Sequence, residues 1–480
     1  MLDIRNLVVD LGTCTTKIGW CSDSEPHMML PTIVGRGRHK GAMLNLGLKD
    51  RYVGRQAQNL RGILNLESPL KDGSVQNWDD VQVLWEYIRD RYLGEERSAH
   101  VLLTVPPLSP KEDWKKLGSI LLESQGVAGV YLANKSALAM YGGGRTTGVC
   151  VDSGEDTTYI VPCLEGIPIP GATLVQRLGG KHVTDTLLKQ LSNGKYSFID
   201  DTFLLWKRNT SKNANHTAKN ARLSVASRFE VVKEAKEKYC CVSPVPLKPG
   251  ESKVEEKVLR LPDGNIVVVG EEALASPEIL FTPHEGHESL HQLVYKSVQL
   301  CDESLRSRLM SNIALVGGNS LLPGMDERLS KELTALFPSN FPVRVQAQKG
   351  REFFSWEGGA HLSSLNSFQE LWISRSDFLE SGAIDNLLQQ PIQLLNTTHS
   401  KNNSSNNNTN SNNNNAGDDI NNNGMPMLSS EERRCKLSVS SYPPSSNEYY
   451  GTPREQSLHY CGGDKVRASK HLYLHTISTY

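Results

Sequence analysis

The sequence has no apolar run of about 18 residues, the length that a membrane-spanning helix requires. Its nine cysteines form no Cys-x-x-Cys pair and no secretory signal precedes them, so we expect reduced thiols in an intracellular protein. Neither sign of charge is in excess, since 52 Lys and Arg residues face 53 Asp and Glu residues. Such a balance gives no global attraction to nucleic acid or to a membrane surface. We therefore expect a soluble cytoplasmic or nuclear protein, with no membrane and no direct nucleic-acid partner.

The length and the alternation of sequence patterns indicate an α/β protein of more than one domain. With 480 residues, the chain can form two or more hydrophobic cores. Residues Val101–Val105 and Val127–Leu132 have the composition of strands, whereas Lys111–Glu123 and Asn134–Tyr141 have the pattern of helices. Strands that alternate with helices in this way are typical of layered α/β structure.

Two stretches depart from this globular pattern. Residues 200–227 carry basic side chains among Asn, Ser and Thr, which predicts a basic surface insertion. A solvated loop is the favoured interpretation, and a nucleic-acid contact is the alternative. Residues 386–480 contain the Asn-rich segment Asn402–Asn423 and then a polar stretch with clusters of Pro and Ser. This composition cannot bury enough apolar surface to fold, so we predict a disordered tail, with an interaction tail as the alternative.

Two similar short motifs lie about 140 residues apart, at Asp10–Thr13 and Asp152–Glu155. Each follows an apolar strand, forms an Asp-x-Gly turn and leads into a returning strand, which predicts a β-hairpin. A duplicated hairpin of this kind can hold a polyphosphate from two sides. The turn amides and hydroxyls would hold the phosphates, and the two aspartates would hold a hydrated divalent cation. One such turn is weak evidence, but two at this separation predict a phosphate clamp.

Beyond these turns, the sequence resembles actin and the actin-related proteins over about residues 5–382. The resemblance rests on stretches distributed through this range: Leu30–Arg36, Arg61–Leu64, Asn77–Asp80, Leu102–Thr104, Gly144–Gly148, Tyr196–Phe198, Lys236–Lys238, Leu261–Gly264, Val316–Gly324 and Phe368–Ser374. Sugar kinases and the large heat-shock chaperones share the fold and the paired hairpins. The stretches between the hairpins, however, are similar to actin and not to either of those families.

The resemblance implies an α/β fold of two lobes around a nucleotide cleft, the actin-like fold shared with the chaperone and sugar-kinase ATPases. One lobe would comprise residues 1–142 and 354–385, with residues 32–68 as its outer subdomain. The other would comprise residues 143–353, with residues 179–288 as its outer subdomain. The basic insertion 200–227 would lie in that second outer subdomain, where an extra loop would hinder ordinary longitudinal packing in a filament.

The resemblance also assigns roles to single residues at a site for ATP or ADP with Mg²⁺ or Ca²⁺. Asp10 and Asp152 match the aspartates that hold the cation through water, and Lys17 matches the lysine that reaches the β- and γ-phosphates. Lys236 and Glu237 match the pair that lines the adenine and ribose pocket. The remaining nucleotide-binding positions lie in the two turns and in a glycine loop: Gly12, Thr13, Cys14, Ser153, Gly154, Glu155, Gly317 and Gly318.

Four positions near this site differ from the family pattern. Cys14 stands where actin has a glycine beside the phosphates, and its side chain would crowd the approach of the backbone. Glu155 and Asp156 replace an Asp-Gly pair, which adds a carboxylate near a polyphosphate and is electrostatically unfavourable. Glu352 replaces a lysine near the base and removes a positive charge. These changes leave a nucleotide-free structural protein as an alternative.

Lys135 and Tyr159 occupy the positions at which actin orients its attacking water with Gln and His. An amide can both donate to and accept from one water, whereas an ammonium only donates. We expect Lys135 to pair with Asp10 or Asp152, or to touch the γ-phosphate, without orienting water. A tyrosine with an ordinary pKa of about 10 is a poor proton acceptor at neutral pH. We therefore expect ATP to be bound but hydrolysed more slowly than by conventional actin.

Protein contacts are the expected mode of action. Residues 38–54 match actin's mobile outer loop, and a cleft for partner helices matches at Tyr141, Thr146, Gly166, Leu362, Leu365 and Phe368. Because Ile167 replaces an aromatic residue in this cleft and the family's C-terminal ending is missing, we do not expect regular self-polymerisation. The expected partners are actin-binding proteins or other actin-like subunits in the cytoplasmic cytoskeleton. The alternatives are a subunit of a nuclear chromatin-remodelling complex and a filament-forming ATPase like conventional actin.

Overall fold

The computed structural model describes residues 5–37, 49–61, 63–93, 99–192, 225–247, 255–260, 266–283 and 286–381, all within one compact unit. The predicted tail 386–480 lies outside the described residues, and residues 38–48 of the predicted outer loop also lie outside them. The predicted insertion 200–227 is also outside them, apart from its last three residues, which begin a helix. Within the described ranges, no helix is both long enough and apolar enough to cross a membrane.

A six-stranded sheet in the order β19-β10-β9-β1-β2-β3 forms the framework of the N-terminal part. β1 pairs antiparallel with β2 and parallel with β9, which in turn pairs parallel with β10. The apolar runs of β1 and β9 are buried on both faces, as expected for parallel strands between layers of helices. The strands are β1 (Arg5–Leu11), β2 (Thr15–Trp20), β3 (Met28–Pro31), β9 (Ala99–Val105), β10 (Gly129–Asn134) and β19 (Ile373–Ser374).

A second six-stranded sheet repeats this arrangement in the order β13-β12-β11-β17-β18, with β14 paired to β12. β11 forms an antiparallel hairpin with β12 and pairs parallel with β17, as β1 does with β2 and β9. The two predicted Asp-x-Gly hairpins are therefore confirmed as equivalent parts of two sheets. The strands are β11 (Gly148–Ser153), β12 (Thr158–Leu164), β13 (Ile167–Pro168), β14 (Leu174–Gln176), β17 (Ile313–Val316) and β18 (Val345–Gln346).

The helices that follow the strands of the first sheet agree with the sequence pattern. The predicted strands and helices between residues 101 and 141 are confirmed, with a π-helical turn, η1 (Ile120–Ser124), after α4. α5 begins one residue later than predicted because the Asn134 side chain caps it, accepting hydrogen bonds from the backbone N–H groups of Ser136 and Ala137. The helices of this part are α3 (Trp78–Tyr92), α4 (Lys111–Ser119), α5 (Lys135–Gly142), α13 (Phe354–Ser363) and α14 (Arg375–Ser381).

The second sheet packs against its own set of helices around a separate hydrophobic core, in which Val151 and Leu315 of the sheet meet Val294 and Leu329 of the helices. The helices are α6 (Gly180–Ser192), α8 (Val225–Tyr239), α9 (Glu272–Ala275), α10 (Leu290–Gln299), α11 (Glu303–Met310) and α12 (Met325–Leu336). Short 3₁₀ helices connect them, namely η2 (Pro170–Ala172), η3 (Pro277–Leu280) and η4 (Gly318–Leu321), while η5 (Asn366–Leu371) precedes β19. The mixed α/β fold predicted from the sequence is confirmed.

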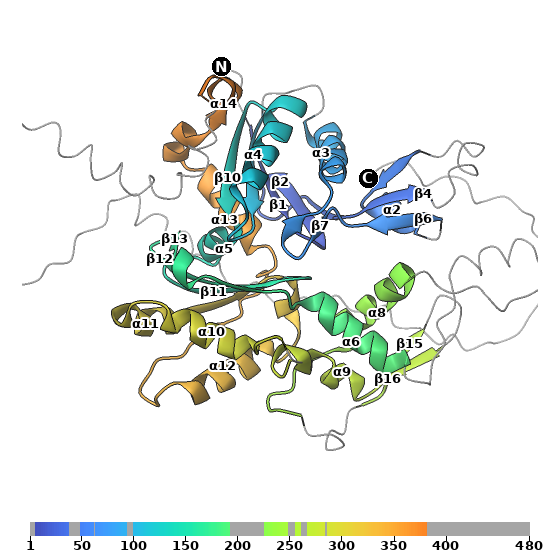
Figure 1. Ribbon diagram of the computed structural model, residues 1–480, viewed down its shortest axis with the longest axis vertical. Coiled ribbons are helices and arrows are strands. Elements are labelled where there is room, and N and C mark those ends of the chain that lie inside the picture. The colour runs from blue at the N-terminus through green and yellow to red at the C-terminus, as the bar shows by residue number, and fades with distance from the viewer. Residues whose placement is uncertain are drawn as a thin grey trace, which may run out of the picture. The chain divides into compact units, whose positions relative to one another are not determined.

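Helices α5 and α13 connect the two parts. α5 contacts β10 of the first sheet and β11 and β12 of the second, and α13 packs closely on α5 (Figure 1). Smaller sheets lie beyond this centre: β4 (Val34–Gly37), β5 (Arg51–Val53) and β6 (Leu64–Glu67) beside α2 (Arg55–Asn59); β7 (Leu70–Lys71) with β8 (Ser74–Val75); and β15 (Lys257–Arg260) with β16 (Ile266–Val269). The predicted boundary between residues 142 and 143 falls between α5 and β11. The exact lobe limits stay predictions.

Candidate functional site

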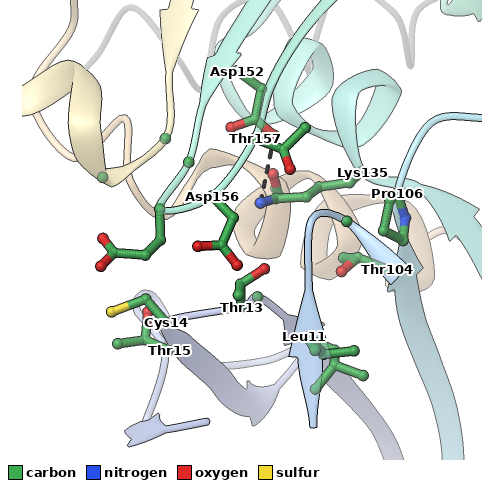
Figure 2. A pocket seen from close by; sticks show the side chains of 18 of the residues that line it. Leu11, Thr13, Cys14, Thr15, Thr104, Pro106, Lys135, Asp152, Asp156 and Thr157 are labelled. Carbon is green, nitrogen blue, oxygen red and sulfur yellow. Dashed lines mark ion pairs between the residues drawn. The ribbon is translucent and has the colours of Figure 1, made fainter. Parts of the chain in front are cut away.

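A single cavity of about 430 Å³ brings most of the predicted site residues together. This volume is within the range of pockets that bind small molecules and cofactors. Figure 2 shows Thr13 and Cys14 of the first turn on one side and Asp152 and Thr157 of the second hairpin on the other. The predicted residues that line it are Gly12, Thr13, Cys14, Lys17, Lys135, Asp152, Gly154, Glu155, Tyr159, Lys236, Glu237, Gly317 and Gly318.

Asp10 is buried behind the wall of this cavity. Its carboxylate accepts a hydrogen bond from Lys17 Nζ at 2.7 Å on one oxygen and from Thr104 Oγ1 at 2.8 Å on the other. Burial by itself would raise the pKa of Asp10, but the ammonium charges of Lys17 and Lys135 and these hydrogen bonds lower it to about 2. Asp10 is therefore ionised at neutral pH, and both of its oxygens already have partners.

The first turn is held from behind by hydroxyl groups. Thr32 Oγ1 donates to the carbonyl oxygen of Gly12 at 2.7 Å, and Ser68 Oγ donates to that of Thr13 at 3.2 Å. A side chain at Gly12 would place its Cβ only 2.7 Å from the carbonyl oxygen of Thr15, so this position requires glycine. The turn is thus fixed by the loops that carry Thr32 and Ser68 as well as by its own two strands.

Asp152 differs from Asp10 in its partners. Its side chain is 2% exposed, and apart from an ion pair with Lys135 neither of its oxygens has a hydrogen-bond partner among the described residues. Lys135 Nζ lies 3.4 Å from Asp152 Oδ2, as the dashed line in Figure 2 marks. Burial by itself would lower the pKa of Lys135, but the carboxylates of Asp152 and Asp10 raise it above its usual value. Lys135 is therefore an ammonium ion at neutral pH.

Ser153 lies just behind the cavity and is linked to it by a residue that the sequence analysis missed. Asn319 lines the cavity, and its Nδ2 donates to Ser153 Oγ at 2.9 Å. Asn319 directly follows Gly317 and Gly318, so its place in that glycine loop was the signal. Gly317 has a φ of 87°, and a Cβ there would lie 2.5 Å from Asp152 Oδ1 and closer still to the carbonyl oxygen of Ser153. The close approach of loop and strand therefore requires glycine.

Helix α8 supplies a further wall with a second residue that was missed. Lys236 Nζ donates to the carbonyl oxygen of Gly180 at 3.1 Å and lies 3.8 Å from Glu155 Oε2. One turn earlier on the same helix, Lys233 Nζ donates to Cys14 Sγ at 2.8 Å. Burial raises the pKa of the Cys14 thiol, so Cys14 is a neutral acceptor for this lysine. The helical spacing from Lys236 was the signal for Lys233.

Asp156 and Tyr159, which depart from the family pattern at the second hairpin as Glu155 does, both line the cavity. Asp156 accepts a hydrogen bond from the backbone N–H of Asp72 at 3.3 Å and lies 3.9 Å from Lys181 Nζ, which offsets part of its charge. Burial raises the pKa of Tyr159 to about 12. At neutral pH the Tyr159 phenol therefore keeps its proton and cannot serve as a base.

Comparison with known protein families gives a match over most of the chain. The family model described as Actin matches residues 1–388, which include every described residue and both hairpins.

Proposed function

The chain belongs to the actin family, and on this premise we propose that it binds ATP or ADP in the cavity between its two hairpins, hydrolyses ATP slowly and acts through protein contacts. The observation that carries the proposal is the convergence of both turns, helix α8 and the glycine loop on one cavity. These are four segments far apart in the sequence, and each supplies a group suited to one part of a nucleotide.

The roles follow from the chemistry at the cavity wall. Lys17 of the first hairpin and Lys135 of α5 both line the cavity and would present ammonium groups to the phosphates. Lys236 and Glu237 would contact the ribose and the base, and the carboxylate of Glu237 can accept hydrogen bonds from hydroxyl groups. Gly317 allows the backbone of the glycine loop to approach closely, since it has no side chain to interfere.

Proteins of this family generally bind a divalent cation together with the nucleotide. Asp152 fits such a cation, because its two buried oxygens have no hydrogen-bond partner among the described residues and can accept from the cation's water shell. In the part of the chain that the structure describes, no three His, Cys, Asp or Glu side chains gather to ligate an ion directly. Mg²⁺ or Ca²⁺ would therefore be held through water, and it would neutralise phosphate charge.

Slow hydrolysis follows from the two residues at the water-positioning places. Lys135 is charged and donates only, so it has no lone pair with which to orient a water. Tyr159 keeps its proton up to a pKa of about 12 and accepts no proton from water at neutral pH. Neither residue can act as a general base. The chain therefore retains the groups that would hold ATP but lacks the groups that would activate the attacking water.

Protein contacts are the proposed output of the nucleotide state, with actin-binding proteins or other actin-like subunits of the cytoplasmic cytoskeleton as partners. Three residues of the predicted partner cleft, Tyr141, Leu362 and Phe368, lie in one apolar cluster, and Leu365 beside them is 44% exposed. Phe368 is fully buried and belongs to the core beneath this surface.

Affinity purification from native cells separates this proposal from a nuclear remodelling complex, since recovery of a helicase-type motor would favour the nuclear alternative.

Isothermal titration of the full-length protein with ATP tests the binding proposal, and helix α8 offers a matched pair of variants. Lys236 is 5% exposed and lines the cavity, whereas the Lys238 side chain, two residues away, is 57% exposed. Lys236→Ala is expected to weaken ATP binding by about tenfold or more, since it removes a charged donor. Lys238→Ala is expected to bind like the wild type. Absence of ATP binding by the wild-type protein would reject the proposal.

A further inference from the structure

Each carboxylate of the two turns has a lysine of its own. The distances between the paired nitrogen and oxygen atoms are 2.7 Å for Lys17 and Asp10, 3.4 Å for Lys135 and Asp152, 3.8 Å for Lys236 and Glu155, and 3.9 Å for Lys181 and Asp156. The negative charges of both hairpins are therefore balanced within the described residues, without any bound ion. This balance matters because uncompensated carboxylates would repel a polyphosphate.

The pair of Lys135 and Asp152 lies at the place where a cation would be needed most. Unlike Asp10, Asp152 has two oxygens without a hydrogen-bond partner among the described residues, which can accept from a hydrated cation, and Lys135 Nζ lies 3.4 Å from one of them. Lys135 is the first residue of α5, directly after the capping residue Asn134, so its backbone position is fixed by both β10 and α5. Its side chain is 19% exposed and lines the cavity, which lets the ammonium group reach a ligand.

The Lys135 ammonium group at this position supplies part of the positive charge that a divalent cation would bring. It neutralises Asp152, and it adds a second ammonium group to the lining of the cavity beside that of Lys17. A hydrated divalent cation would have to share the Asp152 carboxylate with this ammonium and would be repelled by it at short range. The phosphates, in contrast, meet two ammonium groups that need no ion between them.

We propose that Lys135 supplies the positive charge for which ATP would otherwise depend on a divalent cation, so that this chain binds ATP with little dependence on Mg²⁺ or Ca²⁺, even though such a cation can be held through water at Asp152. The inference rests on the proposed nucleotide binding and concerns the charge that accompanies it. It makes Lys135 a binding and specificity residue rather than an inert replacement in the catalytic position.

The test is an ATP titration of the full-length protein in two buffers, one with Mg²⁺ and one with EDTA. For the wild type, EDTA is expected to weaken ATP binding by less than about threefold, because Lys135 supplies the charge. For Lys135→Gln and Lys135→Met, EDTA is expected to weaken it by about a hundredfold. Lys331→Gln is the control, because Lys331 is an exposed surface lysine paired with Glu327, and it should behave like the wild type.

The wild-type protein and the Lys135 variants together decide between the outcomes. ATP binding that falls about a hundredfold in EDTA overturns the inference and leaves the proposed function standing. Absence of ATP binding in both buffers overturns the two together. If the Lys135 variants bind ATP equally with and without Mg²⁺, the ammonium is not the substitute, and the assignment to Lys135 is wrong. Thermal unfolding without nucleotide gives a second readout, in which Mg²⁺ should stabilise Lys135→Met more than the wild type.

Discussion

The two hairpins have the same Asp-x-Gly turn and the same place in their sheets, yet their aspartates are in different states. In the first hairpin, Lys17 lies directly opposite Asp10 in the strand register and pairs with it. In the second, the residue opposite Asp152 is Tyr159, which is no cation. The neighbouring parallel strands also differ. β9 supplies the hydroxyl group of Thr104 to Asp10, while β17 places Val316 beside Asp152.

The difference shows that one motif can serve two purposes. The first hairpin is closed by its own lysine and hydroxyl, so Asp10 mainly fixes Lys17 at the cavity wall. In the second hairpin, no described group of the same sheet donates a hydrogen bond to Asp152. Lys135 of α5 forms an ion pair with it instead. We infer that the first aspartate is chiefly structural and that the second is the one that responds to ligands.

The largest expected effect is a difference in the free energy of unfolding between variants of the two aspartates. Asp10→Asn leaves Lys17 buried without its counter-charge and is expected to lower the free energy of unfolding by about 3–5 kcal/mol. Asp152→Asn is expected to cost only about 1 kcal/mol, because its pair with Lys135 is longer and its oxygens accept no hydrogen bond from the described residues. Chemical denaturation of both variants without nucleotide measures this. Equal losses would contradict the distinction between the hairpins.

The next largest effect is expected at the glycine loop, where Gly317 approaches Asp152 and Ser153 of the second hairpin. Gly317→Ala forces a side chain into a positive φ and against Ser153 and Asp152, so we expect a loss of about 3 kcal/mol in stability and weaker ATP binding. Gly318→Ala is the matched control for stability, since a Cβ there would meet no protein atom within 4 Å. Denaturation measures the stability of both variants, and ATP titration measures the binding of Gly317→Ala. Similar behaviour of the two would mean that the loop does not contact the hairpin as described.

The smallest of the three effects is the dependence of stability on pH that the first hairpin contributes. An unfolded aspartate ionises with a pKa of about 3.9, whereas the pKa of Asp10 in the folded protein is about 2. The lowered pKa stabilises the fold above about pH 4, and this contribution is lost as the pH falls toward 2. The stability difference between the wild type and Asp10→Asn should therefore shrink by about 2 kcal/mol over that range. A difference that stays constant would show that Asp10 does not have a lowered pKa.

The hairpins, the α/β alternation and the cavity residues could be predicted because their signals are local. An Asp-x-Gly turn after an apolar run, or Lys236 and Glu237 in a recognisable stretch, can be read from a few consecutive residues. The family resemblance then placed these segments around one site.

The partners of the site residues could not be predicted in the same way. The contacts of Lys233 with Cys14 and of Asp72 with Asp156 join residues 219 and 84 positions apart, and they depend on how separate segments approach each other. The different partners of Asp10 and Asp152 could not be predicted either, because the two turns have similar sequences. They differ through Thr104 and Val316, which lie on neighbouring strands far away in the sequence.

The most direct test of the account is the fate of ATP in a single turnover on the full-length protein. Excess protein is mixed with labelled ATP, and the bound nucleotide is identified at intervals beside conventional actin under the same conditions. The chain is expected to bind ATP and still to hold most of it as ATP when actin has converted its own to ADP. The double variant Lys135→Gln with Tyr159→His should convert it faster. Hydrolysis by the wild type at the rate of conventional actin would contradict the account.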